Sequence, residues 1–216
     1  KLARHRAVHA ADARLAGSYA RVAFIAADAG CADARATTPA RSSSAIIPGI
    51  LSLMDLMAEN PVCTTSNLVV AKAVFEATGG FKVGMSFAED QEWLIRTVAQ
   101  HHALIGIDEL LVDYRLSPAG LSVNLEGMYA GWRALADDHL ADPALRDAAE
   151  ALYCRYLARR ALRAGSAPQQ AWAYALRGLR LDRHAFLADR RRGLMTLASA
   201  ACAPMLPRAL RLRAFA

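Results

Sequence analysis

The stretch that decides the fold runs from Asn60 to Arg115 and reads NPVCTTSNLVVAKAVFEATGGFKVGMSFAEDQEWLIRTVAQHHALIGIDELLVDYR. Its apolar patterns predict a strand, a short helix, a longer helix and two short strand pieces, over residues 61–70, 71–78, 87–101 and 103–115. Gly79 and Gly80 end the short helix, and the acidic pair Glu89-Asp90 opens the longer one. The last two strand pieces lie on either side of Asp108-Glu109.

The residues before this stretch predict further elements of the same kind. Residues 1–14 are typical of a helix, and residues 18–26 of a strand because they are β-branched and aromatic. Gly30, Pro39 and a serine triplet predict a loop over residues 28–44. Residues 46–57 are apolar at helical spacing, and Asn60-Pro61 ends that helix because the residue before proline avoids helical angles.

After the decisive stretch the pattern becomes helical. We expect four helices and a short last one, the four over residues 122–140, 143–163, 168–181 and 183–200. Pro143 and Pro168 stand where a helix tolerates proline, in its first turn. The sequence therefore predicts an α/β fold, a partial mixed sheet with flanking helices over residues 1–139, followed by an all-α C-terminal region over residues 140–216.

Charge is distributed unevenly along the 216 residues. Residues 140–216 carry 14 arginines and five acidic residues, a charge of +9, so residues 1–139 carry −3 of the total of +6. The arginines recur at helical spacing as Arg155, Arg159, Arg160 and Arg163, then Arg177, Arg180 and Arg183, then Arg190 to Arg192. Such faces are either solvated or in contact with an anionic membrane surface. The sequence contains no basic stripe interleaved with aromatic residues, so it does not indicate a nucleic-acid partner.

Cysteine spacing and hydropathy indicate the cellular compartment of the protein. The four cysteines are far apart and form no Cys-x-x-Cys pair, which favours buried thiols in a reducing compartment over disulfides or zinc ligands. The longest apolar run, residues 194–206, is shorter than the ~20 residues of a membrane-spanning helix and contains Pro204. We expect a cytoplasmic protein, peripheral at the inner face of the membrane if the basic tail binds lipid.

Several short motifs follow one another in an order that resembles a known family. They are an apolar strand, a Gly-Gly-Phe turn, a Glu-Asp pair opening a helix that carries Trp and Arg, and a final Tyr-Arg, here residues 67–70, 79–81, 89–90, Trp93, Arg96 and 114–115. This order resembles the acceptor half of a family 2 glycosyltransferase with the GT-A fold. The resemblance covers roughly residues 1–130.

The resemblance implies an inverting transfer of sugar from a nucleotide-sugar donor to a carbohydrate or lipid-linked acceptor, as in the synthesis of cell-envelope polysaccharide. It gives Asp90 the role of the base that deprotonates the acceptor hydroxyl, with Glu89 hydrogen-bonding the loop or the acceptor. A carboxylate at a helix N-terminus stays ionised and fixed in place, which suits a base. The alternative is that Glu89 and Asp90 only cap the helix.

Five further residues are candidates for substrate binding. Gly79 and Gly80 permit a close backbone approach to an acceptor, and they equally suit a helix C-cap. Trp93 and Arg96 offer a stacking face for a sugar and a cation for a phosphate, with core packing of Trp93 as the alternative. Arg115, at a strand end, could approach the diphosphate or pair with Asp113 or Glu109.

The chain also departs from the family pattern. Lys82 stands where the family usually has Asp or Asn, and Ser117 where many members have a metal-binding His. The nucleotide-binding half, with its Asp-x-Asp motif, is absent, and the chain opens on Lys1-Leu2, so we expect a fragment that is inactive by itself. A divalent metal, Mg or Mn, is expected in the full-length parent, and no metal ligand is assigned here. The competing hypothesis is a non-catalytic helical interaction or scaffold module.

Overall fold

A computed structural model describes residues 1–25, 42–115, 123–164, 168–207 and 210–211 of the chain. The chain divides into two compact units, residues 1–56 with 60–117 and residues 57–59 with 118–216. The first unit is a mixed sheet with helices, and in the second the described residues form helices without strands. This geometric boundary lies before the predicted one at residues 139 and 140, which divides the chain by function and stays a prediction.

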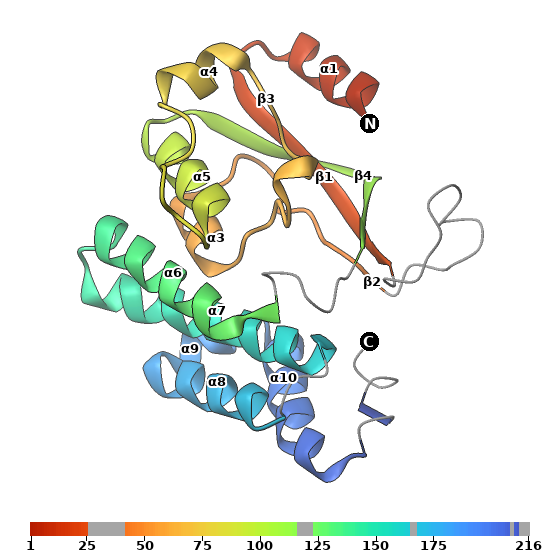
Figure 1. Ribbon diagram of the computed structural model, residues 1–216, viewed down its shortest axis with the longest axis vertical. Coiled ribbons are helices and arrows are strands. Elements are labelled where there is room, and N and C mark those ends of the chain that lie inside the picture. Colours follow the sequence, from red (N-terminus) through yellow and green to blue (C-terminus); the bar gives the residue numbers. More distant parts are fainter. Residues whose placement is uncertain (26–41, 116–122, 165–167, 208–209, 212–216) are drawn as a thin grey trace. The chain divides into compact units, whose positions relative to one another are not determined.

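Strand β1, Leu15–Ile25, is the centre of the sheet in the first unit. Strand β4, Ala103–Arg115, runs parallel to it along its whole length (Figure 1). Two short antiparallel strands complete the sheet, β3 (Val69–Val70) near the start of β1 and β2 (Ser42–Ser43) near its end. Almost every residue of β1 is buried, as its apolar sequence requires of a central strand. The predicted mixed sheet with flanking helices is confirmed.

Strand β4 is one strand with a bulge, where the sequence suggested two pieces. Ala20 of β1 faces Ile107, but the next residue, Arg21, faces Leu110, so two extra residues of β4 lie between them. These residues are Asp108 and Glu109, the acidic pair that interrupts the apolar pattern. The bulge places both acidic residues outside the regular pairing, and after a further shift at Leu111 the strands pair regularly from Val112 to Arg115.

The predicted strand over residues 61–70 is wrong for most of its length. The chain turns there, forms the 3-10 helix η1 (Thr65–Asn67), and pairs with β1 only through β3. The buried side chain of Asn67 explains the difference. Its Nδ2 donates to the carbonyls of Ala20 (2.7 Å) and Val62 (2.9 Å), and its Oδ1 accepts from the Ala20 amide (3.1 Å). One side chain thus satisfies backbone groups that a strand would have paired.

The predicted helix over residues 46–57 is confirmed only at its end, because α3 spans Leu53–Ala58. Ile50 instead bridges to Ile105, and the Leu51 amide donates to the Leu104 carbonyl (2.9 Å), so this segment borders β4. Ser52 and Asp55 then start the helix with reciprocal hydrogen bonds, Ser52 amide to Asp55 Oδ2 (2.8 Å) and Asp55 amide to Ser52 Oγ (3.2 Å). A free strand edge outcompetes the local helical pattern.

The other predicted helices of the first unit are present as α1 (Leu2–Ala11), α4 (Lys72–Ala77) and α5 (Glu89–Ala99). Helix α1 is fastened to β1 by two imidazoles on one serine hydroxyl. Ser18 Oγ lies 2.8 Å from His5 Nδ1 and 3.0 Å from His9 Nε2. Burial, reinforced by the charge of Lys1, lowers the pKa of His5 to about 4, so the ring is neutral at physiological pH.

The second unit contains α6 (Leu125–His139), α7 (Pro143–Ala164), α8 (Pro168–Leu181), α9 (Arg183–Phe186), α10 (Arg190–Cys202) and the 3-10 helix η3 (Ala203–Met205). Helices α7 and α8 run side by side (Figure 1). The single helix predicted over residues 183–200 is divided into α9 and α10. Asp182 and Asp189 each accept amide hydrogen bonds as the N-cap of the helix that follows, which explains the division. None of the described helices has the length and apolar character that a membrane-spanning segment needs.

Candidate functional site

The loop between α4 and α5 has an unusual backbone. Gly79 and Gly80 adopt φ values of +76° and +63°, which glycine permits without a steric penalty. Ala88, the residue immediately before the acidic pair, also has a positive φ of +61°. A left-handed conformation costs an L-residue about 1–2 kcal/mol. Such strain tends to cluster at functional sites. Cys63 and His101 share it, and Ala88 is the residue that leads directly into Glu89 and Asp90.

Asp90 lies in the first turn of α5 with its carboxylate fixed on both sides. Oδ2 accepts from the Nδ2 of Asn60 at 3.0 Å, and Oδ1 accepts from the Gln91 amide at 2.7 Å. Burial raises the pKa of Asp90, against the effect of these hydrogen bonds, and the neighbouring charge of Glu89 raises it further. A carboxylate with a raised pKa is a stronger proton acceptor than an exposed aspartate. The arrangement therefore suits a general base.

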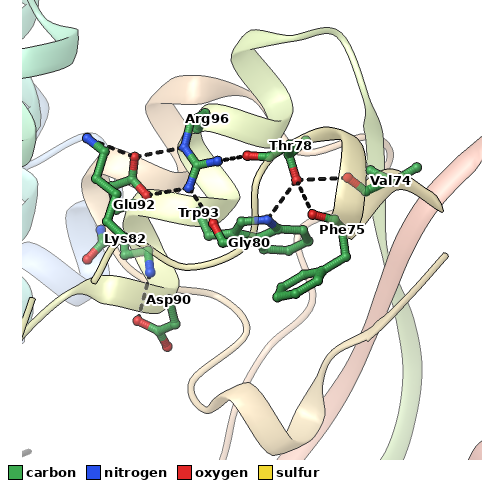
Figure 2. Close-up of polar contacts among 10 residues, drawn as sticks. Val74, Phe75, Thr78, Gly80, Lys82, Asp90, Glu92, Trp93 and Arg96 are labelled. Atoms are coloured by element: carbon green, nitrogen blue, oxygen red, sulfur yellow. Dashed lines mark hydrogen bonds and ion pairs between the residues drawn. The ribbon is translucent and has the colours of Figure 1, made fainter. Parts of the chain in front are cut away.

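An ion pair between Glu92 and Arg96, one turn apart on α5, holds the preceding loop. Glu92 is fully buried, and its carboxylate accepts from Arg96 through Nε to Oε1 (3.0 Å) and Nη2 to Oε2 (2.8 Å), as Figure 2 shows. Lys82 Nζ lies 3.1 Å from the same carboxylate. Burial alone would raise the pKa of Glu92, but the hydrogen bonds and charges of Arg96 and Lys82 outweigh it and lower the pKa. Glu92 is therefore ionised in the interior.

Arg96 also binds the end of α4. Its guanidinium donates to the carbonyls of Thr78 and Gly80, the latter at 2.7 Å (Figure 2). All three nitrogens of the side chain are thus engaged inside the unit. The sequence suggested a cation for a phosphate at this position, whereas the structure uses Arg96 to fasten the Gly-Gly turn to α5. The turn carrying Gly79 and Gly80 is held beside the helix that begins with Asp90.

Trp93 is in the core, which was the alternative to a sugar-stacking role. It is fully buried, and its ring centroid lies 5.5 Å from that of Phe75 and 6.0 Å from that of Phe81. Its Nε1 donates to Thr78 Oγ1 at 2.9 Å (Figure 2). A ring enclosed in this way has no open face for a sugar. Trp93 instead supports the same turn that Arg96 binds.

Arg115 ends β4 opposite Ile25 and is exposed. Of the two carboxylates considered for it, Glu109 pairs with Arg4. Tyr114, its neighbour, packs edge-on against Phe24 with ring centroids 5.8 Å apart. A role of Arg115 toward a diphosphate stays a prediction, and Ser117 lies outside the described residues.

Three residues of this site were not recognised from the sequence. Asn60 is 30 residues away from Asp90, and no local pattern connects the two. Lys82 is a departure from the family pattern, and its ammonium adds a second cation to the ion pair of Glu92. Glu92 stands four residues before Arg96, a spacing that favours ion pairs on a helix and could have indicated this one.

Comparisons with known proteins add no family. No protein-family model, no curated protein and no solved structure matches this chain. Within the described part of the chain, no group of three or more His, Cys, Asp or Glu side chains is placed to hold a metal ion.

Proposed function

We propose that this chain is the acceptor half and helical tail of an inverting GT-A-type glycosyltransferase, which transfers sugar from a nucleotide-sugar donor to an acceptor hydroxyl. The observation that carries the proposal is the state of Asp90. Its carboxylate is oriented by Asn60 and the Gln91 amide, and burial raises its pKa. The mixed sheet and the Gly79-Gly80 turn support the family resemblance at a coarser level.

In the proposed reaction the acceptor oxygen attacks the anomeric carbon of the donor as the bond to the nucleoside diphosphate breaks. Asp90 takes the hydroxyl proton during this step, which makes the oxygen a better nucleophile. Asn60 keeps the carboxylate from rotating, and the turn held by Arg96 lies next to the helix that presents it. The side chains of this loop thus position the acceptor side of an in-line displacement.

A divalent metal would neutralise charge on the departing diphosphate in such an enzyme. The described residues contain no cluster suited to it. We therefore assign the binding of donor and metal to no residue described here, and the proposal for this chain is limited to the acceptor side.

The second candidate is a non-catalytic interaction or scaffold module. It is favoured by the internal use of Trp93 and Arg96 and by the place of Asp90 in the first turn of α5, where its carboxylate accepts from the Gln91 amide and suits the helix dipole. In that case Asp90 contributes to stability and takes no proton.

The two candidates are distinguished by Asp90→Asn in the full-length protein that contains this chain. Asparagine keeps the size and one acceptor oxygen but cannot take a proton, so we expect kcat to fall on the order of 10²–10⁴-fold with donor KM unchanged. Because the base must be ionised, kcat/KM of the wild type should fall as the pH drops through the raised pKa of Asp90. Glu76→Gln, an exposed carboxylate on α4, is the matched control and should leave kcat unchanged.

A different result would contradict a catalytic role of Asp90. If Asp90→Asn keeps kcat within a few-fold while Asp90→Ala lowers the melting temperature, Asp90 is a helix cap and the enzymatic proposal fails.

A further inference from the structure

Helix α10 and the turn that follows it expose an apolar face. Leu194 is 58% exposed, Met195 61% and Met205 84%. The smaller residues Ala198, Ala201 and Cys202 are exposed as well. At 100° per residue the exposed side chains of α10 fall on one side of the helix, while Gly193, Thr196 and Ala200 on the other side are buried in the helical unit. Met205 lies in η3, directly after the helix. The side of α10 that is exposed is therefore the apolar one, the reverse of what is usual for a surface helix.

Two exposed arginines, Arg190 and Arg191, begin the same face one turn before Leu194. Arg192 differs from them, because it pairs with Glu59 (3.8 Å) and Asp189 (3.7 Å) within its own unit. From residue 190 to the end the sequence has six arginines and no acidic residue. The face thus combines a basic end with an apolar body and carries no negative charge.

Other arginines of the second unit serve the fold. Arg155 is buried and donates to the Phe186 carbonyl at 2.9 Å, and Arg177 lies 2.8 Å from the carboxylate of Glu150. Burial lowers the pKa of Arg159. The broad basic surface expected from the sequence is consequently reduced. On α10, exposed arginines occur together with the two large apolar side chains Leu194 and Met195.

We propose that the exposed face of α10 binds an anionic lipid surface, with the helix axis in the plane of the membrane. Leu194, Met195 and Met205 enter the boundary between headgroups and acyl chains, and Arg190 and Arg191 contact lipid phosphates. Thirteen residues rise only about 20 Å, less than the ~30 Å hydrocarbon core, so the helix lies on the surface and does not cross it. This inference is independent of the proposed glycosyl transfer.

A lipid surface fits this face better than a second copy of the chain. A two-fold interface would place the same face against itself. Among the described residues from 190 to 207 there is no carboxylate to pair with Arg190 or Arg191, and Asp189, which borders the face, already pairs with Arg192. Anionic headgroups supply that charge, and they do so without the shape complementarity that a protein partner requires.

The test is co-sedimentation of the 216-residue chain with vesicles of phosphatidylcholine alone and of equimolar phosphatidylcholine and phosphatidylglycerol. We expect binding to the anionic vesicles that weakens with salt. Leu194→Glu should lower it at least about tenfold, because one apolar side chain leaves the interface and a negative charge enters it. Arg190→Ala should lower it about fivefold. Leu145→Glu, on a leucine of α7 that is 48% exposed, is the matched control and should bind like the wild type.

Three outcomes would overturn the proposal. They are equal binding to both kinds of vesicle, equal effects of Leu194→Glu and Leu145→Glu, and absence of binding combined with a dimer that Leu194→Glu dissociates. The last result would give the face to a second copy of the chain. Circular dichroism melts of each variant verify that these surface substitutions leave the fold intact.

Discussion

Replacing Arg96 by methionine tests the ion pair that fastens the Gly-Gly turn to α5. Methionine keeps much of the side-chain volume and removes the charge together with every hydrogen bond that Arg96 donates. The carboxylate of Glu92 then stays buried, with Lys82 as its remaining ion-pair partner among the described residues. The carbonyls of Thr78 and Gly80 lose a donor in the same step.

The expected cost follows from the burial of Glu92. Removing one partner of a buried ion pair typically destabilises a protein by about 3–5 kcal/mol, because the other charge is left in the interior. Arg96 is 20% exposed and Lys82 stays in place, so we expect the lower end, about 3 kcal/mol of unfolding free energy at neutral pH. Lys82→Met is the matched control. Its 47% exposed ammonium should contribute less than about 1 kcal/mol.

The pH dependence sharpens the test. In the wild type the pKa of Glu92 is below its ordinary 4.5, so the pair stabilises the fold above that value and is lost as the pH falls through the lowered pKa. Without Arg96, burial favours the protonated acid, which needs no cation. The cost of Arg96→Met should therefore be largest at neutral pH and shrink near pH 4.5.

The assay is urea unfolding followed by tryptophan fluorescence at both pH values, since Trp93 lies against the same turn. A cost for Arg96→Met no larger than that for Lys82→Met would refute the reasoning. So would a cost that does not change with pH.

The remaining predictions concern packing in each unit. Trp93→Phe should cost about 1 kcal/mol in urea unfolding through the lost hydrogen bond to Thr78, while the acceptor KM stays unchanged; a large rise in KM would restore a binding role for the indole. Gly178→Ala should lower the melting temperature and cost about 1–3 kcal/mol of unfolding free energy, because the new Cβ would lie 2.8 Å from the Ala151 carbonyl oxygen of α7. A melting temperature that rises, as helix propensity alone would favour, would contradict the close approach of α7 and α8.

Local signals in the sequence predict much of the fold. The β-branched and aromatic residues between 18 and 26 predict a strand there, and β1 forms over Leu15–Ile25 as the buried centre of the sheet. Gly79-Gly80 ends α4, and Pro143 and Pro168 begin α7 and α8, because glycine and proline act on the backbone of their own neighbours. These effects extend over one helical turn and are legible in the chain itself.

Residues 46–52 and 61–68 depart from their local sequence patterns because distant partners decide their conformation. The edge of β4 takes up Ile50 and Leu51, and the side chain of Asn67 occupies the backbone groups of Ala20. Neither partner lies within 40 residues along the chain, so no window of local sequence contains the competing hydrogen bonds.

The candidate site likewise has features set by local sequence and features set by tertiary contacts. The sequence by itself determined that Glu89 and Asp90 begin α5, since acidic residues favour the first turn of a helix. Only the tertiary structure decided the orientation of Asp90 by Asn60, the burial that raises its pKa, and the use of Trp93 and Arg96 inside the fold. The physical reason is that helix starts depend on neighbouring residues, whereas burial and long-range hydrogen bonds exist only once remote segments have packed together.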